Sequence, residues 1–244
     1  SPPPPLRRPR RRAPHPLRAA SRGCSPVLGR TTRVRSALTT LVYRQLPAPG
    51  LQPAPCCMAG RPWPGWAGRG DAPRSTREAE RSVSAHAWPV DPGHLVDTGI
   101  RLLICDLRLA TQPFLAGLKH LNRLEQVMAR SEWDDRSIHE GLLLDREDHV
   151  VSAISSNVFL VLAGRLLTPR LDLCGVRGVM RRAILNAFRD RCEQRRIMLD
   201  MLPEADEVFV CNSVRGIFPV TRIDNWEYEL GPVTREVQGW LSRQ

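Results

Sequence analysis

Hydrophobic residues are distributed differently in the two parts of the chain. Residues 1–95 show little regular alternation apart from a short stretch near residues 34–42, whereas residues 96–244 contain short apolar runs separated by turn residues. Runs of this length and spacing are typical of strands in a mixed, largely antiparallel sheet that curls into a barrel. Strands are predicted at residues 100–105, 140–145, 150–154, 157–162, 165–168 and 208–210, with one more after Gly216.

Helical periodicity occurs at three places in the same region. Leu118, Leu121, Leu124 and Val127, preceded by Leu115, recur at helical spacing and predict a helix with a buried apolar face. A second helix is predicted after Gly178, and a third near residues 237–241. The second helix has an apolar face formed by Val179, Ala183, Ile184, Ala187 and Phe188. The fold class is therefore α+β, a barrel-like mixed sheet with flanking helices, with Phe218 and Trp226 expected in its core.

Charge and proline content divide the chain at the same point. Residues 1–95 hold 16 arginines, 4 acidic residues and 17 of the 22 prolines, whereas residues 96–244 hold 20 basic and 21 acidic residues. The formal net charge of +11 therefore resides in the first part. We expect residues 1–95 to be a Pro/Arg-rich region of low order and residues 96–244 to form the folded domain.

Three interpretations of residues 1–95 remain open. A disordered basic extension could contact nucleic acid or an anionic surface, although we expect no nucleic-acid partner for the folded domain. A targeting segment fits the arginine content, but the prolines oppose an amphipathic helix. Arg, Pro, Ala and Gly also dominate out-of-frame translation of GC-rich coding sequence, so we favour an atypical or mistranslated replacement of an N-terminal domain.

The seven cysteines indicate neither a metal site nor a disulfide framework. None forms a Cys-x-x-Cys pair, and the adjacent Cys56 and Cys57 lack the spacing of zinc ligands. Scattered thiols in an odd number fit a reducing cytoplasm. No apolar run reaches the roughly 18 residues that a membrane-spanning helix needs, so we expect no membrane partner.

Lys119 is the only lysine among 36 basic residues. Arginine stays protonated in proteins, whereas an amine can lose its proton in a dry pocket and attack a carbonyl. The composition alone also fits a leftover surface charge. In the first turn of the predicted helix, burial and the positive helix end would both lower the pKa of Lys119.

The residues around Lys119 carry a family resemblance. Residues 117–126 read Gly-Leu-Lys-His-Leu-Asn-Arg-Leu-Glu-Gln and resemble the lysine segment of the aminodeoxychorismate lyases, which are class IV, or fold-type IV, pyridoxal-phosphate enzymes. Residues 106–113 match the same pattern. The resemblance covers residues 96–244 and implies the C-terminal domain of that fold, a homodimer, and the cofactor pyridoxal 5'-phosphate bonded to Lys119.

Two loops are candidates for holding the cofactor phosphate. The glycine-punctuated residues 173–181 lead into a helix, whose free N–H groups can bind an anion, although an ordinary loop–helix junction would look alike. The resemblance assigns the phosphate to the backbone amides of Val179 and Met180, after Gly178. It assigns further phosphate contacts to Asn212 and Ser213 in a second polar bend. Arg177, Arg181 and Arg182 add positive charge nearby, and most of them are expected to face solvent.

One position departs from the family pattern. Residues 156–159 read Ser-Asn-Val-Phe and resemble a family segment in which a glutamate precedes the asparagine by five positions and pairs with the pyridine nitrogen. Here the asparagine is Asn157 and the glutamate position is Ser152. A serine hydroxyl cannot hold the ring cationic as a carboxylate does, which weakens the electron sink. Elimination should tolerate this better than transamination.

The resemblance implies a lyase that converts 4-amino-4-deoxychorismate into pyruvate and 4-aminobenzoate for folate synthesis. Lys119 would act first as the nucleophile and then as the acid/base group. A branched-chain or D-amino-acid aminotransferase of the same fold is the alternative enzyme. A third possibility is an inactive remnant with a basic binding tail, because the family's N-terminal domain supplies a phosphate-binding arginine that matches no residue here.

Overall fold

The computed structural model describes residues 56–59, 83–86 and 94–244, and the chain divides into two units, Ser1–Trp88 and Pro89–Gln244. In the first unit, β1 (Cys56–Ala59) pairs antiparallel with β2 (Val83–His86), with Cys56 opposite His86. Most of the region predicted to have low order lies outside the described residues. Among the described residues, no helix is long and apolar enough to cross a membrane.

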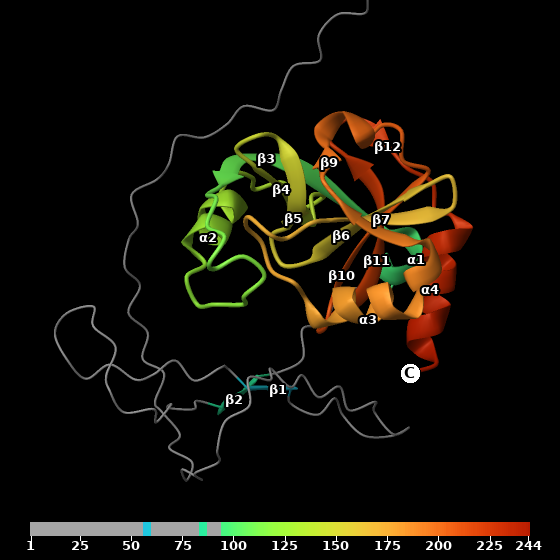
Figure 1. Cartoon of the computed structure of the whole chain (residues 1–244), viewed down its shortest axis with the longest axis horizontal. Helices are drawn as coiled ribbons and strands as arrows, with labels where there is room; N and C mark the ends of the chain where they lie inside the picture. Colours follow the sequence, from blue (N-terminus) through green and yellow to red (C-terminus); the bar gives the residue numbers. More distant parts are fainter. Residues whose placement is uncertain (1–55, 60–82, 87–93) are drawn as a thin grey trace, which may run out of the picture. The chain divides into compact units, whose positions relative to one another are not determined.

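The second unit is built on a ten-stranded mixed sheet that curls into a barrel-like shape, as predicted (Figure 1). The spatial order is β8-β7-β6-β10-β11-β3-β4-β5-β9, and β12 pairs with β11. The strands are β3 (Ile100–Leu109), β4 (Glu140–Asp145), β5 (His149–Ala153), β6 (Asn157–Leu162), β7 (Arg165–Pro169), β8 (Cys192–Arg195), β9 (Ile197–Met198), β10 (Glu207–Asn212), β11 (Gly216–Ile223) and β12 (Trp226–Glu227). Three neighbouring pairs of this sheet, β11–β3, β3–β4 and β7–β8, are parallel, and the others are antiparallel.

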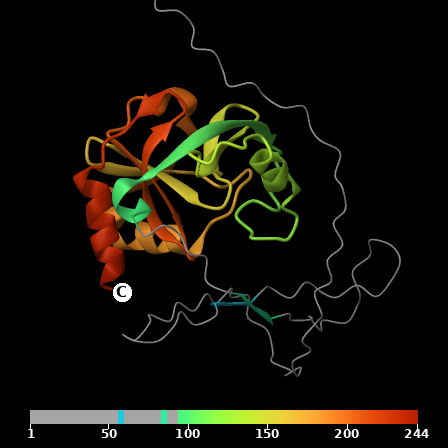
Figure 2. The same cartoon turned by 180° about the vertical axis from the view of Figure 1, so that it is seen from behind.

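The continuous apolar run of β4 is explained by burial on both faces. Leu142 and Leu144 point into the main core, and Leu143 points into a second core with Val151 and Leu171. Figure 2 shows the sheet from behind. All three leucines of β4 are fully buried. A strand with core on each side has no polar face, so it cannot alternate as an edge strand does.

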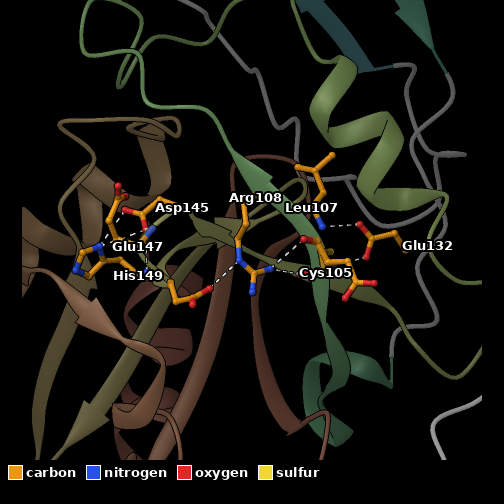
Figure 3. Close-up of polar contacts among 9 residues, drawn as sticks. Cys105, Leu107, Arg108, Glu132, Asp145, Glu147 and His149 are labelled. Atoms are coloured by element: carbon orange, nitrogen blue, oxygen red, sulfur yellow. Dashed lines mark hydrogen bonds and ion pairs between the residues drawn. The ribbon is translucent and has the colours of Figure 1, made fainter.

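Tight turns join the hairpins. Ala163 and Gly164 between β6 and β7 have φ values of 48° and 73°, the positive values that a two-residue hairpin turn requires. Between β4 and β5, Asp145 accepts hydrogen bonds from the backbone N–H groups of Glu147 and His149 at 3.0 and 2.9 Å (Figure 3). The His149 ring also lies 3.1 Å from the buried Asp145 carboxylate. These contacts hold the turn in place.

Four helices in the described part of the chain flank the sheet: α1 (Leu95–Thr98), α2 (Leu124–Arg130), α3 (Val179–Ala187) and α4 (Pro232–Ser242). Short 3-10 turns occur at Arg189–Arg191 and Leu199–Met201. Ile184 of α3 and Val237 of α4 cover a third core in which Phe159 and Phe209 stack at 4.9 Å. The predicted second and third helices are therefore confirmed, as is the burial of Phe218, whereas Trp226 is half-buried against the main core.

The predicted helix with a buried face over residues 115–127 is wrong. The helix α2 begins only at Leu124, and Leu121, Leu124 and Val127 are 81%, 65% and 63% exposed. Gly117 has a φ of 83°, outside the helical region, and its backbone N–H and C=O bond to a loop distant in sequence instead of to neighbouring turns of a helix. The leucines before α2 therefore lie in a turn and a loop, and their spacing does not reflect a helix.

An irregularity in β3 fixes the position of α2. Between Ile104 and Arg108 the register with β4 shifts, which leaves the backbone N–H groups of Asp106 and Leu107 outside the ladder. Glu132, just after α2, accepts hydrogen bonds from both at 2.6 and 2.9 Å (Figure 3). By bonding to these two N–H groups, which have no partner in the ladder, this carboxylate holds the end of α2 against the bulged strand.

Candidate active site

The segment that carries Lys119 lies directly against the glycine-punctuated loop. The backbone N–H of Gln112 donates to Leu173 O at 2.8 Å, and Gly117 N–H donates to Gly175 O at 2.9 Å. In return, Arg177 N–H donates to Gly117 O at 3.1 Å. Two stretches that are more than 50 residues apart in sequence therefore form a short parallel bridge, two residues before Lys119.

Gly178 is required by a close approach to Asn157. A Cβ atom at residue 178 would lie 2.2 Å from the Asn157 Oδ1 atom, far inside contact distance. The Asn157 side chain accepts a hydrogen bond from Gly178 N–H at 3.2 Å and donates one to Val176 O at 2.8 Å. Asn157, at the start of β6, thus holds the loop that leads into α3.

The N-terminus of α3 is open to an anion. Gly178 is the N-cap residue, and among the described residues no side chain caps this end and no acidic residue lies in its first turn. The first amides of a helix lack partners within the helix, and the helix dipole adds positive potential there. The amides of Val179 and Met180 are therefore suited to binding a phosphate group.

The three arginines near this loop differ in their surroundings. Arg177 and Arg182 are exposed, as expected, but Arg181 is buried. Arg181 donates hydrogen bonds to Pro169 O and the Gln194 side chain at 2.8 and 2.9 Å. Its guanidinium therefore joins α3 to β7 and β8 and does not face the open end of the helix.

The second polar bend lies at the same end of the sheet. Cys211 of β10 is the register partner of Asn157, so Asn212 and Ser213 follow directly beside it. Asn212 accepts hydrogen bonds from the N–H groups of Val214 and Arg215 at 3.0 and 2.7 Å. Asn212 therefore shapes the bend, and Ser213 is half-buried within it.

Ser152 faces the same side of the sheet as the glycine-punctuated loop. It is the register partner of Leu143, and residues paired across a ladder point to the same face. Leu143 belongs to the second core together with Leu171 and Cys174, at the start of that loop. Ser152 is buried on this side and has no charge.

The surroundings of Lys119 lower the pKa of its ammonium group. Desolvation lowers the pKa of the Lys119 ammonium, and the positive charge of Arg123 lowers that pKa further. Although the residue as a whole remains exposed, a lower pKa raises the share of free amine at neutral pH. The predicted contribution of a helix end is wrong, because Lys119 lies in a loop five residues before α2.

Glu140 is a site residue that the sequence analysis missed. This buried carboxylate at the start of β4 accepts hydrogen bonds from the Ser155 backbone N–H at 2.5 Å and from the Ser155 and Ser156 hydroxyls at 2.8 and 3.0 Å. Asn212 donates to Ser156 Oγ at 3.1 Å. Glu140 therefore connects the turn before Asn157 to the second polar bend. In the sequence, Glu140 could have been recognised as the one acidic residue at the start of an apolar strand.

Comparisons with known proteins identify the family and the fold. The model of the amino-transferase class IV family matches residues 61–223, starting ahead of the boundary predicted at residue 96. Aminodeoxychorismate lyase from Vibrio harveyi is 34% identical over 186 residues, which cover 73% of this chain and 68% of the relative. The crystal structure of 4-amino-4-deoxychorismate lyase from Pseudomonas aeruginosa matches with a TM-score of 0.69 and 42% identity, over 78% of this chain and 70% of that chain.

A likeness of fold extends to aminotransferases. A branched-chain amino acid aminotransferase from T.th., whose structure was solved with pyridoxamine 5'-phosphate, matches with a TM-score of 0.67 and 24% identity over 77% of this chain and 65% of that chain. The mixed sheet with its flanking helices is thus the fold of the class IV aminotransferases. The chain belongs to the amino-transferase class IV family.

Proposed function

We propose that this chain is a pyridoxal-phosphate-dependent lyase that converts 4-amino-4-deoxychorismate into 4-aminobenzoate and pyruvate. The observation that carries the proposal is the bridge between the lysine segment and the glycine-punctuated loop, with Gly117 bonded to Gly175 and Arg177. This bridge supports the proposal because it joins the backbone two residues before Lys119 to the loop that leads into the uncapped end of α3. The similarity to the lyases from Vibrio harveyi and Pseudomonas aeruginosa supports the reaction type.

The residues present fit the cofactor. An aldehyde needs a primary amine of lowered pKa, which Lys119 provides, and a phosphate needs anion-binding amides, which Val179 and Met180 provide. Ser213 would add a hydroxyl donor from the second bend. Asn157 and Asn212 would position these groups, because their side chains already bond to the two loops.

Each residue then has a defined chemical task. When bound, pyridoxal phosphate supplies an electron sink for negative charge on the carbon that bears the substrate amine. Lys119 would hold the cofactor, and after the substrate amine displaces it, would accept the proton from that carbon as a base. The pair of electrons released would expel the enolpyruvyl oxygen, and protonation of the departing group gives pyruvate. Lys119 would then bond to the cofactor again, which would release the remaining aromatic ring as 4-aminobenzoate.

Ser152 favours elimination over amino transfer. Its side chain faces the glycine-punctuated loop but carries no charge that could keep a pyridine ring cationic. Transamination must store charge in the ring, whereas elimination discharges it at once into the leaving group. The aminotransferases of similar fold remain the alternative.

Exposed apolar side chains surround the Lys119 segment. Phe114, Leu121, Leu124, Val127 and Met128 are between 54% and 92% exposed and lie on the segment that surrounds Lys119. An apolar surface of this kind marks a protein interface. We propose a homodimer that covers this apolar segment. The free, buried thiols of Cys105, Cys174 and Cys211 support a reducing compartment such as the cytoplasm.

Turnover separates the candidate functions. Equal amounts of wild-type chain and Lys119→Ala are incubated with pyridoxal phosphate and 4-amino-4-deoxychorismate, and the pyruvate and 4-aminobenzoate formed are measured. The lyase predicts product from the wild type only. In a parallel arm, conversion of the cofactor to pyridoxamine phosphate by an amino acid identifies an aminotransferase. A chain that retains no cofactor and forms neither product is an inactive remnant.

A further inference from the structure

A cavity lies beside the turn between β4 and β5. Its volume is about 400 Å³. Two acidic and three apolar residues line it: Asp148, Met198, Leu199, Asp200 and Trp226. The sheet brings the turn and β9 together, because Met198 is the register partner of His149, the residue that follows Asp148. A concave site of this size with apolar walls can hold a small molecule.

The cavity is separate from the candidate active site. Leu199 and Trp226 pack against the main core, whereas the glycine-punctuated loop beside the Lys119 segment packs through Cys174 against the second core. These two cores lie on opposite faces of β4, and the cavity contains no residue assigned to the cofactor. A ligand in the cavity would therefore not occupy the place of the reacting substrate.

The polar lining of the cavity is acidic. Asp148 and Asp200 are its only charged residues. Asp148 Oδ1 accepts a hydrogen bond from Arg108 Nε at 2.8 Å, so this guanidinium balances the charge of Asp148. The exposed Asp200 makes no hydrogen bond or ion pair within the described part of the chain. Its carboxylate therefore leaves the cavity with an uncompensated negative charge, which attracts a cation.

The apolar walls favour an organic cation over a metal ion. An indole ring such as that of Trp226 attracts a cation placed over its face, and the thioether of Met198, which is 42% exposed, makes adaptable contacts. A magnesium or calcium ion needs about six oxygen ligands, more than two carboxylates provide. An ammonium group on an aryl or alkyl body matches both the charge and the walls.

We propose that this cavity binds a small organic ammonium ion, with its charge at the Asp200 carboxylate and its aryl or alkyl body against Trp226 and Met198. The oxygen of Asp148 that Arg108 does not engage lies on the same lining and adds to the attraction. The proposal does not rest on the lyase reaction, because no residue of the cavity takes part in that reaction.

Isothermal titration of the full chain with benzyltrimethylammonium chloride, at constant ionic strength, tests the site. A quaternary ammonium cannot form an imine, so this probe does not react with the cofactor. We expect one probe molecule per chain. Benzyl alcohol, which carries the same ring without charge, should bind at least about tenfold more weakly, because it lacks both the attraction to the carboxylate and the cation–π contact.

Two variants locate the bound probe. Asp200→Asn should weaken binding about two- to fivefold, the range for an exposed ion pair. Trp226→Leu keeps an apolar wall without the ring and should weaken binding by a similar factor, with thermal unfolding as the check that it is folded. Asp190→Asn is the matched control and should bind as the wild type does, because the Asp190 side chain is 98% exposed and outside the cavity. Lys119→Ala should also bind unchanged.

Four results would overturn the proposal. Equal binding of benzyl alcohol would remove the role of the charge, and unchanged affinity in Asp200→Asn would place the probe elsewhere. Displacement of the probe by an equal concentration of tetramethylammonium would remove the role of the apolar body. Loss of binding in Lys119→Ala would assign the probe to the candidate active site.

Discussion

The substitution Gly178→Ala tests how the phosphate-binding loop is built. The added Cβ would lie 2.2 Å from Asn157 Oδ1, so the Asn157 side chain must rotate away. It would lose its hydrogen bonds to Gly178 N–H and Val176 O, each worth about 0.5–1.5 kcal/mol, for a total of about 1–3 kcal/mol. If forming the phosphate-binding conformation of the loop requires these hydrogen bonds, the same free energy is lost from cofactor binding. Pyridoxal phosphate should then bind at least about fivefold more weakly, since about 1.4 kcal/mol is a factor of ten.

Urea unfolding measures the stability change of Gly178→Ala, and titration of visible absorbance measures cofactor affinity. Gly239→Ala is the matched control, because its Cβ meets only Arg243 Nη1 at 3.5 Å and alanine is favoured in a helix by about 0.5–1 kcal/mol. In an Asn157→Ala background the obstructing oxygen is gone, so Gly178→Ala should cost much less there. Equal costs in both backgrounds would refute the steric reasoning.

Three further predictions follow from charges and exposed surfaces. Arg123→Gln removes a positive neighbour, so the pKa of Lys119 should rise and the pH titration of cofactor attachment, followed by absorbance, should move to higher pH; an unchanged midpoint would contradict the assigned cause. Ser152→Glu introduces a carboxylate and should raise the rate of pyridoxamine phosphate formation from an amino acid relative to the rate of lyase turnover. Thermal unfolding checks that the variant is folded. A fall in the ratio of the two rates would argue against the role given to the Ser152 hydroxyl. Leu121→Asp/Leu124→Asp should convert the proposed dimer to monomer in sedimentation velocity without loss of stability, because both side chains are exposed in the single chain; a dimer that persists would locate the interface elsewhere.

The strands were predictable because their signal is local. Buried apolar runs bounded by turn residues identify β4, β5 and β6 within one or two residues, and the open glycine-punctuated loop before α3 is visible in the sequence. The order in which distant strands pair is not local. Nothing in the composition of β3 indicates that it lies parallel between β11 and β4.

The predicted helix over residues 115–127 and the predicted exposure of Arg181 differ from the structure for the same physical reason. Leu118 and Leu121 continue the helical spacing of α2, but the positive φ of Gly117 and its bonds to Gly175 and Arg177 hold the chain in a loop there. In the same way, Arg181 looks like a solvent-facing charge until Pro169 O and Gln194 supply acceptors for its buried guanidinium. Long-range hydrogen bonds override local pattern at each of these positions, and only the folded chain reveals them.

The proposed reaction requires a covalent bond between Lys119 and the cofactor. Chain loaded with pyridoxal phosphate is desalted, reduced with borohydride, digested and analysed by mass spectrometry, with Lys119→Ala treated in parallel. We predict one phosphopyridoxyl group per chain, located on Lys119, and none in the variant. A chain that retains no cofactor, or one labelled equally in the absence of Lys119, would contradict the central claim.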